Sequence, residues 1–508
     1  MRLRGSFTVF SALSMLLIAS FLFALLEAAR VKGLGAYTVL TSKAGIESVC
    51  AEYQSELWDC YHLLGLDTAR GNNSFSMNGI SDTLSERVSE NLQTQRGLHS
   101  QMNLFQLKFV QADYIEYQLA SDGEGDVFLG QVASYMKHHL PEEMAKKIYE
   151  NYRKGREVAE SEGAEYSVED ADEAIREAKR AKEEANKKAS EADGAASPEK
   201  VPDFPAGPAT QESQQANPLE TVLELKKNAL LGMVVGDTSS ISDKSTDLSG
   251  VMLQRKVQTG VKQKLKGATW YDKVLALEYI NQYFSNYMAP TEEHTLSYEM
   301  EYILCGKSTD KDNLDAVISR LLLLREVANV THIISDRNKC NEALLIANAL
   351  AGFSGNPAVI KVVQIGIVAA WAYVESILDI RTLLSGGKMA VIKSGGQWTT
   401  ELKHLGEALQ NHARAIECTN GLKYDGYVKQ CLFALDNKIL AYRMMDIIEL
   451  NIRKMSKNSA FRMDYVLCEM SYELEYEATP LFSELSIIGH NKIPKIRFSR
   501  TEEFSYLR

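Results

Sequence analysis

The strongest hydrophobic pattern in the chain is an apolar run close to its first residue. Residues 7–26 contain no charged side chain, and only four serines or threonines interrupt them. At a rise of about 1.5 Å per residue, the run matches the hydrocarbon thickness of a bilayer. A signal peptide has a shorter apolar region, of about 7–15 residues, and ends at small side chains, whereas cleavage after Ala28 or Ala29 would place Leu26 or Glu27 at the −3 position. We therefore predict a retained transmembrane helix over 7–26.

Charged residues mark the end of this span. Glu27 and Arg30 are three residues apart, so on a helix they share a face and can form an ion pair where the span leaves the bilayer. Arginines and lysines are equally frequent on both sides of the span, so counting them leaves its orientation open.

A helical stripe follows the span. Apolar residues recur at intervals of three and four from Ile46 to Leu64, which predicts an amphipathic helix that continues the anchor and packs on the folded body. Gly33, Gly35 and Thr38 leave room for a kink between the two parts.

A second apolar stretch, residues 365–374, is only ten residues long between Gln364 and Glu375. Because that length is too short to cross a bilayer, we predict a buried core helix instead.

Alternating apolar and polar residues predict strands over 105–119, 296–304 and 466–476. Period-3.6 patterns predict helices over 126–139, 219–231, 270–288, 312–334, 338–352, 358–384, 398–416 and 425–454. Strands and helices that cluster in separate stretches favour an α+β fold with an antiparallel sheet and a mainly helical C-terminal body. Whether 105–119 and 466–476 share one sheet stays open.

The composition changes between residues 151 and 218. Of the residues in 151–200, 24 are charged, and five of the ten prolines of the chain lie in 194–218. We predict a solvated helix over 167–192 followed by a proline-rich spacer, and no coiled coil, because an apolar seam is missing. The predicted organisation is a tail (1–6), the span (7–26), a membrane-proximal α+β region (27–150), the charged helix and linker (151–218) and a helix-rich α+β domain (219–508).

Overall composition excludes several classes of protein. With 45% apolar and 24% charged residues, the chain is too polar for a multi-spanning transporter and too apolar to be disordered throughout. A formal charge of −11 argues against a nucleic-acid binder. The seven cysteines show neither a disulfide framework nor the spacing of a zinc site.

Motifs for chemistry are nearly absent. The sequence from Ser385 to Lys388 lacks the first glycine and the final Ser or Thr of a phosphate-binding loop, and Gly386 and Gly387 are better explained as the end of a helix at 384. Two pairs of glutamates, Glu299/Glu301 and Glu473/Glu475, fall on one face of a predicted strand, as two catalytic acids would, but such residues are usually solvated. We expect no catalytic residue, no cofactor and no metal site.

Several segments together resemble a known family. Residues 4–10, 26–31, 51–53 and 56–61, and later 298–307, 321–329 and 369–376, resemble an uncharacterised family of single-span proteins of Gram-positive bacteria that is associated with Tad (Flp-type) pilus and secretion loci. The N-terminal part is also similar to TadE/TadG-like minor pilins. Prepilins carry a glycine before their cleavage site and a glutamate five residues after it; Gly5 fits the first position, whereas Phe10 occupies the second.

The resemblance implies a cell-membrane protein with a cytoplasmic N-terminus and an extracytoplasmic body. It further implies a structural or assembly role in a pilus or secretion apparatus, with the lipid bilayer (through 7–26) and other apparatus proteins as partners. Glu27, Arg30, Tyr53 and Trp58 are the candidate interaction residues. Two alternatives stay open, a membrane-tethered envelope enzyme that uses one of the glutamate pairs, and an adhesin or ligand-binding module.

Overall fold

The computed structural model describes residues 3–94, 106–159, 168–192, 217–262, 267–455, 458–481 and 494–507. It confirms the α+β class, with long helices and one antiparallel sheet. Contacts divide the chain into two compact units. Unit 1 comprises Met1–Pro141, Ser249–Ala276 and Asn437–Arg508, and unit 2 comprises Glu142–Leu248 and Leu277–Asp436. These units interleave along the chain, whereas the boundaries predicted from sequence follow one another.

Unit 1 begins with α1 (Leu3–Cys50), one helix that contains the predicted span and the segment after it. The predicted kink at Gly33 and Gly35 is wrong, because the helix runs through both residues and the Thr38 hydroxyl donates to the carbonyl of Gly35 at 2.8 Å. The continuous helix predicted as far as Leu64 is also wrong. The N–H of Gln54 donates to Gly65 instead of to the preceding turn, and a separate helix, α2 (Ser55–Tyr61), follows.

The sheet of unit 1 has β3 (Val466–Ala478) at its centre. β2 (Leu107–Leu119) pairs with one edge of β3, while β4 (Ile496–Ser505) and the short β1 (Leu66–Asp67) pair with β3 on its other side, all antiparallel. The two predicted strands at 105–119 and 466–476 are confirmed, and they share this sheet. β4 was missed, because its arginines and glutamates hide its alternation.

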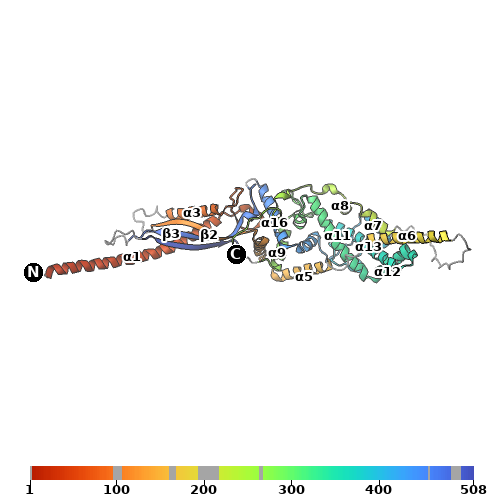
Figure 1. Cartoon of the computed structure of the whole chain (residues 1–508), viewed down its shortest axis with the longest axis horizontal. Helices are drawn as coiled ribbons and strands as arrows, with labels where there is room; N and C mark the ends of the chain where they lie inside the picture. Colours follow the sequence, from red (N-terminus) through yellow and green to blue (C-terminus); the bar gives the residue numbers. More distant parts are fainter. Residues whose placement is uncertain are drawn as a thin grey trace. The chain divides into compact units, whose positions relative to one another are not determined.

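Two helices cover one face of this sheet (Figure 1). α1 packs on β4, and α3 (Met77–Thr94) packs on β2 and on α1. The even-numbered side chains of β3 point into this core, while the odd-numbered glutamates of β3 lie on the opposite face. The core is formed by residues such as Leu34, Ile46, Val49, Ile80, Leu84, Val88, Met470, Tyr472, Leu474 and Tyr476. Unit 1 also contains α4 (Asp126–Met136) and α16 (Asn437–Lys454), and α9 spans Trp270–Tyr283.

Unit 2 is helical, and its longest helix is α13 (Pro357–Leu384). The Asn356 side chain caps its first turn, and Gly386, with φ of 91°, lies just beyond its end, as predicted. Helices α6, α7, α8, α11, α12 and α14 pack around α13. The helices of unit 2 are α5 (Glu142–Ala159), α6 (Val168–Ala192), α7 (Pro218–Leu225), α8 (Leu230–Val235), α10 (Glu299–Cys305), α11 (Asp310–Ser335), α12 (Arg337–Ala351), α13, α14 (Leu405–Gln410) and α15 (Tyr424–Phe433).

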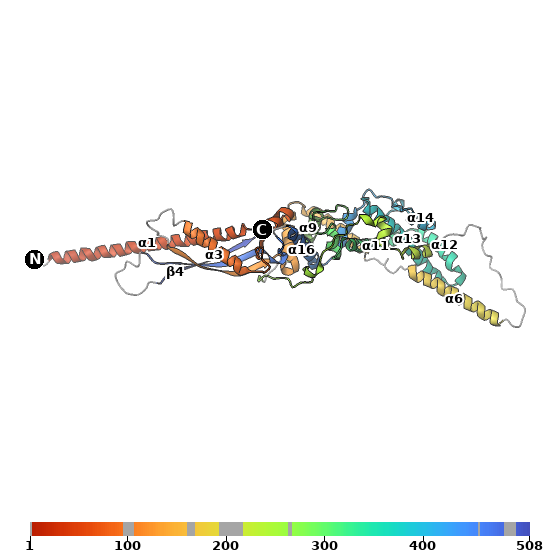
Figure 2. The same cartoon turned by 90° about the horizontal axis from the view of Figure 1, so that it is seen from above.

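The charged helix α6 is not fully solvated, contrary to the prediction. It lies along α13, and its C-terminal end extends past α12 (Figure 2). Val168, Ala171 and Ile175 are buried on its inner face. Alanines at helical spacing let two backbones approach closely, so a helix with few large apolar residues still packs.

Four other predicted elements are wrong. The predicted helix over 219–231 is interrupted after Leu225, and its last residues belong to α8. The predicted strand over 296–304 is largely the helix α10, in which every residue is buried. The alternation of apolar and polar residues therefore does not reflect a buried face and an exposed face. The predicted helix over 398–416 is reduced to α14 and one short 3-10 turn, Leu402–His404, and the one over 425–454 is two helices, α15 and α16.

Candidate functional site

The N-terminal half of α1 presents apolar side chains on all sides. Among the described residues, two helices are long and apolar enough to cross a membrane, one from Phe7 within α1 and the other α13. The most apolar stretch of α1 has no part buried in the protein, whereas 56% of that of α13 is buried. At about 25 cal/mol per Å² of apolar surface, exposing twenty such residues to water would be very unfavourable. The first half of α1 is therefore suited to lipid.

Glu27 and Arg30 lie where the apolar segment of α1, which has no protein around it, reaches the sheet. The expected ion pair is present, with Arg30 Nη1 2.7 Å from Glu27 Oε1. Arg30 Nη2 also donates to the carbonyl of Thr479 at 2.9 Å, and the N–H of Leu481 donates to Glu27 Oε2 at 3.2 Å. The pair thus ties α1 to the end of β3, a connection across more than 400 residues that sequence spacing could not reveal.

The other two candidate residues lie at the far end of α1. Tyr53 and Trp58 are both exposed, and Trp58 packs edge-to-face on His62 with ring centroids 5.4 Å apart. Along α1 beyond Arg30, Val39 and Leu40 are exposed as well, at 46% and 62%. Val39 and Leu40 share the exposed side of α1 with the Lys43–Glu47 pair, and the role of Tyr53 and Trp58 in contacts stays a prediction.

The two glutamate pairs have different environments: one lies on an open face of the sheet, and the other is buried in unit 2. Glu473 and Glu475 lie on the open face of β3, where Ser499 donates to Glu473 at 2.6 Å. Glu301, in contrast, is buried, and accepts from the N–H of Tyr287 at 2.9 Å and from the hydroxyl of Tyr424 at 2.6 Å. Burial raises the pKa of Glu301 to about 7.

Glu299 is buried beside it, contrary to the expectation of solvated acids. It accepts from the N–H of Ser285 at 2.9 Å, and His294 Nδ1 lies 2.9 Å from its other oxygen. Both glutamates of α10 therefore hold the loop that follows α9.

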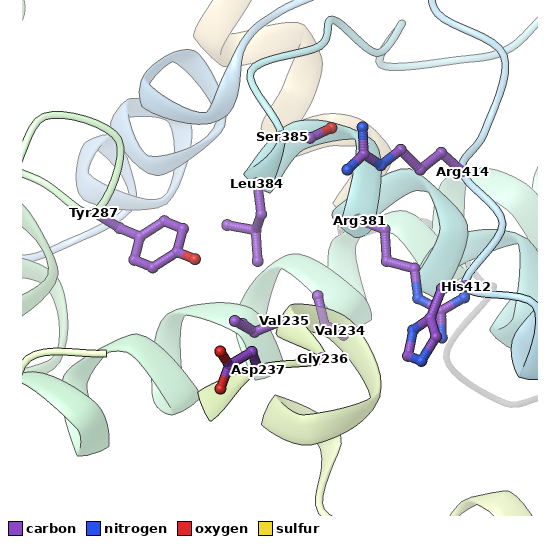
Figure 3. Close-up of a pocket in the computed structure, with 10 residues that line it drawn as sticks. All are labelled: Val234, Val235, Gly236, Asp237, Tyr287, Arg381, Leu384, Ser385, His412 and Arg414. Carbon is purple, nitrogen blue, oxygen red and sulfur yellow. The ribbon is translucent and has the colours of Figure 1, made fainter. Parts of the chain in front are cut away.

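A pocket of about 380 Å³ opens in unit 2 (Figure 3). The end of α8, the end of α13 and the loop after α14 contribute to its lining. Val234 and Val235 belong to the end of α8, and Arg381, Leu384 and Ser385 to the end of α13. In Figure 3, Tyr287 faces the pocket from one side, opposite Arg381, His412 and Arg414, while Gly236 and Asp237 close the lower wall. None of the four glutamates above lines this pocket.

Arg381 holds the walls of the pocket together. Its Nε and Nη2 donate to the carbonyl of Met233 at 3.0 and 2.8 Å, Nη2 also to Leu409 at 3.1 Å, and Nη1 to Ala413 at 3.3 Å. All of these acceptors are backbone carbonyls at or after helix ends, which a guanidinium satisfies well. Burial without a carboxylate lowers the pKa of Arg381. No sequence pattern marks this arginine as a functional residue.

A second group of charges in unit 2 is fully enclosed. Arg325 Nη2 lies 2.9 Å from Asp379 Oδ2, and Lys393 contacts both Glu375 and Asp379, with 2.6 Å between Lys393 Nζ and Asp379 Oδ1. Glu375 Oε2 also accepts from the N–H of Thr400 at 2.8 Å. Two cations thus face two carboxylates with no exposed side chain, which identifies this cluster as part of the core.

Within the ranges that the structure describes, no group of three or more His, Cys, Asp or Glu side chains is placed to hold a metal ion. A family model described as "Family of unknown function (DUF5702)" matches residues 208–478. Neither a curated protein nor a solved structure matches the chain.

Proposed function

The chain belongs to DUF5702, a family of unknown function, and we propose that it is a membrane-anchored structural or assembly component of a Tad/Flp-type pilus or secretion apparatus. In this proposal residues 7–26 cross the membrane, the N-terminus is cytoplasmic, and the folded body is extracytoplasmic. The protein then works by packing against neighbouring subunits through α1.

One observation carries the proposal. α1 is a single helix of 48 residues in which a bare apolar segment continues directly into a segment packed on an antiparallel sheet. The Glu27–Arg30 pair, bonded to Thr479, fixes the helix to the sheet at the boundary between the two segments. A force or a displacement of the anchor is transmitted through this connection to unit 1, which is what an assembly subunit requires.

The outer face of α1 supplies a contact surface next to the membrane. Val39 and Leu40 point away from the sheet core and are exposed, on the same helix as the anchor. In this proposal Val39 and Leu40 contact a neighbouring subunit, because such a contact would remove their exposed apolar surface from water. The resemblance to TadE/TadG-like minor pilins supports the same assignment.

Site-specific photo-cross-linking tests the proposal. A photoreactive amino acid is placed at Leu40 of the full chain in its native membrane, and the products are identified by mass spectrometry. We expect cross-links to other components of the pilus or secretion apparatus. A matched probe at Asp315, an exposed residue of α11 in unit 2, should not give the same products.

Two outcomes contradict the proposal. Recovery of lipid adducts alone from Leu40 would remove the assembly role and leave only an anchor. Equal products from Leu40 and Asp315 would show that the contacts are unspecific. N-terminal sequencing of the mature protein adds a check on processing, because a start at Ser6 would show prepilin-type cleavage despite Phe10.

A further inference from the structure

We propose that the pocket at the ends of α8 and α13 binds a small organic anion, with its carboxylate or phosphate group at Arg414 and its apolar part against Leu384 and Tyr287. This inference concerns unit 2 alone and does not depend on the assembly role. The shared ligand chemistry is one anionic group joined to an apolar or aromatic body.

Arg381 places an uncompensated positive charge beside the pocket. Its guanidinium is almost fully buried, and the groups that accept its hydrogen bonds, the carbonyls of Met233, Leu409 and Ala413 among them, carry no formal charge. No carboxylate within the described ranges lies within ion-pair distance of it. A buried cation without an acidic partner raises the electrostatic potential of the cavity beside it, which favours a negative ligand.

Arg414 supplies the hydrogen-bond donors for the anionic group, and His412 lines the pocket from the same loop. Both side chains are exposed on the loop after α14, and neither has an ion pair or hydrogen bond to a side chain elsewhere in the described structure. In Figure 3 the guanidinium of Arg414 reaches back beside Ser385. His412 has a positive φ of 49°, unusual for a residue other than glycine, and its N–H donates to Leu409. Arg381 bonds the carbonyls of Leu409 and Ala413 on either side of His412, so it acts as a positioning residue for this loop.

Asp237 is the one acidic residue in the lining, and it limits the charge of the ligand. Its Oδ1 accepts from the N–H of Ser239 at 2.9 Å and from the Ser239 hydroxyl at 2.6 Å, and these bonds lower its pKa. The carboxylate therefore stays ionised, and the lining has two arginines against one acid. This balance suits a ligand of one or two negative charges.

The remaining walls are apolar. Val234 is buried, Leu384 lies in the centre of the view in Figure 3, and the ring of Tyr287 faces the cavity. Ligand pockets usually combine such walls with a few polar groups, and a volume of about 380 Å³ lies in the range of small-molecule sites. An inorganic ion would leave these walls uncovered, so we expect an organic ligand.

Calorimetric titration of the full chain in lipid nanodiscs tests the inference. The probes are phenyl phosphate and benzoate, with inorganic phosphate and neutral benzyl alcohol as comparisons. We expect saturable binding of the first two, with Kd on the order of 0.1–1 mM, weaker binding of inorganic phosphate, and none of benzyl alcohol. Arg414→Gln should weaken phenyl phosphate binding by about 5–10-fold because it removes a charge-assisted hydrogen bond, whereas Arg414→Lys should retain most of it.

Two further variants make the result decisive. Asp237→Asn should strengthen binding about two- to threefold, because it removes the opposing charge and keeps the side-chain acceptor for Ser239. Lys227→Gln, which removes an exposed cation of unit 2 outside the pocket, should leave Kd unchanged. The inference is overturned if neither organic anion binds, if Arg414→Gln and Lys227→Gln behave alike, if Asp237→Asn weakens binding, or if inorganic phosphate or benzyl alcohol binds as tightly as phenyl phosphate.

Discussion

Two helices of this protein, α1 and α13, are both long and apolar enough to cross a membrane, yet their surroundings differ completely. The apolar segment of α1 has no protein around it, whereas six other described helices pack on α13. Residues 7–26 contain no charge, but the second half of α13 contains Glu375, Asp379 and Arg381. Hydropathy identifies both helices, whereas the charged residues within a helix decide whether its surroundings can be lipid or must be protein.

The partners of these charges explain why α13 belongs to a protein core. Asp379 pairs with Arg325 of α11, and Lys393 contacts Glu375 and Asp379 from the loop after α13. Removing charges from water costs several kcal/mol per ion, and opposite charges with good hydrogen bonds offset that cost. A lipid environment would offer no such partners, so α13 is stable only inside unit 2.

The largest effect is expected when charges are placed in the anchor. Leu13→Arg together with Leu17→Arg puts two cations in the span, at about 2.5–3.5 kcal/mol each on insertion scales. We expect the double variant to lose membrane integration and to appear in the soluble or aggregated fraction after alkaline extraction.

The matched control is Leu40→Arg, which adds a cation to an exposed position of α1 beyond the span. This variant should stay in the membrane pellet as the wild type does. If the double variant also stayed there, residues 7–26 would not be the membrane anchor, and the contrast between α1 and α13 would fail.

The second largest effect is expected from the charge cluster of α13. Asp379→Ala leaves Arg325 and Lys393 buried with Glu375 as their single carboxylate partner in the cluster, and breaking a buried ion pair typically costs about 3–5 kcal/mol. Unit 2 should therefore unfold at lower denaturant concentration. Tryptophan emission can follow this transition, since the ring of Trp398 lies 5.5 Å from Lys393 Nζ.

Asp315→Ala is the control for this substitution, because it removes an exposed acid of α11. Its effect should stay within about 0.5 kcal/mol. Equal destabilisation by both variants would mean that the enclosed cluster does not hold α13 in the core.

An effect of intermediate size is expected from pH, through a carboxyl group that lies where α6 and α7 cover α13. Burial raises the pKa of Glu326 to about 7; Lys226 lowers it and Glu169 raises it, both by smaller amounts. Its ordinary value is 4.5, so between these two pH values the folded state binds more protons than the unfolded state. The free energy of unfolding should therefore fall as pH rises from about 4.5 to about 7, by roughly 2–3 kcal/mol from this group.

The measurement is the difference between the wild type and Glu326→Gln across this pH range. Glu301 titrates in the same direction and window, so it contributes equally to both proteins and cancels. If the difference in the free energy of unfolding does not change with pH, or changes with the opposite sign, burial does not raise the pKa of Glu326.

Sequence patterns predicted the local features of this fold and missed those that depend on distant partners. The span, the strands at β2 and β3, and the buried helix at 365–374 follow from periodicity and from nearby charges. The alternation at 296–304 misled because α10 is buried on every side. Arg381 gave no sequence signal, since its hydrogen bonds are to backbone carbonyls that folding brings to it from two other segments.

The smallest effect is expected at the connection between α1 and the sheet, which lies directly after the uncharged apolar segment of α1. Glu27→Ala removes the partner of Arg30 and the acceptor for the N–H of Leu481. A partly buried charged hydrogen bond is worth about 1 kcal/mol, or roughly fivefold in an opening equilibrium. The amide of Leu481 should therefore exchange with deuterium about five times faster, measured on the full chain in nanodiscs. Lys495→Gln, which breaks the exposed Lys495–Glu477 pair of the same sheet, should leave this rate unchanged. If both variants accelerated exchange equally, the pair would be an ordinary surface contact, and α1 would be held to the sheet by apolar packing alone.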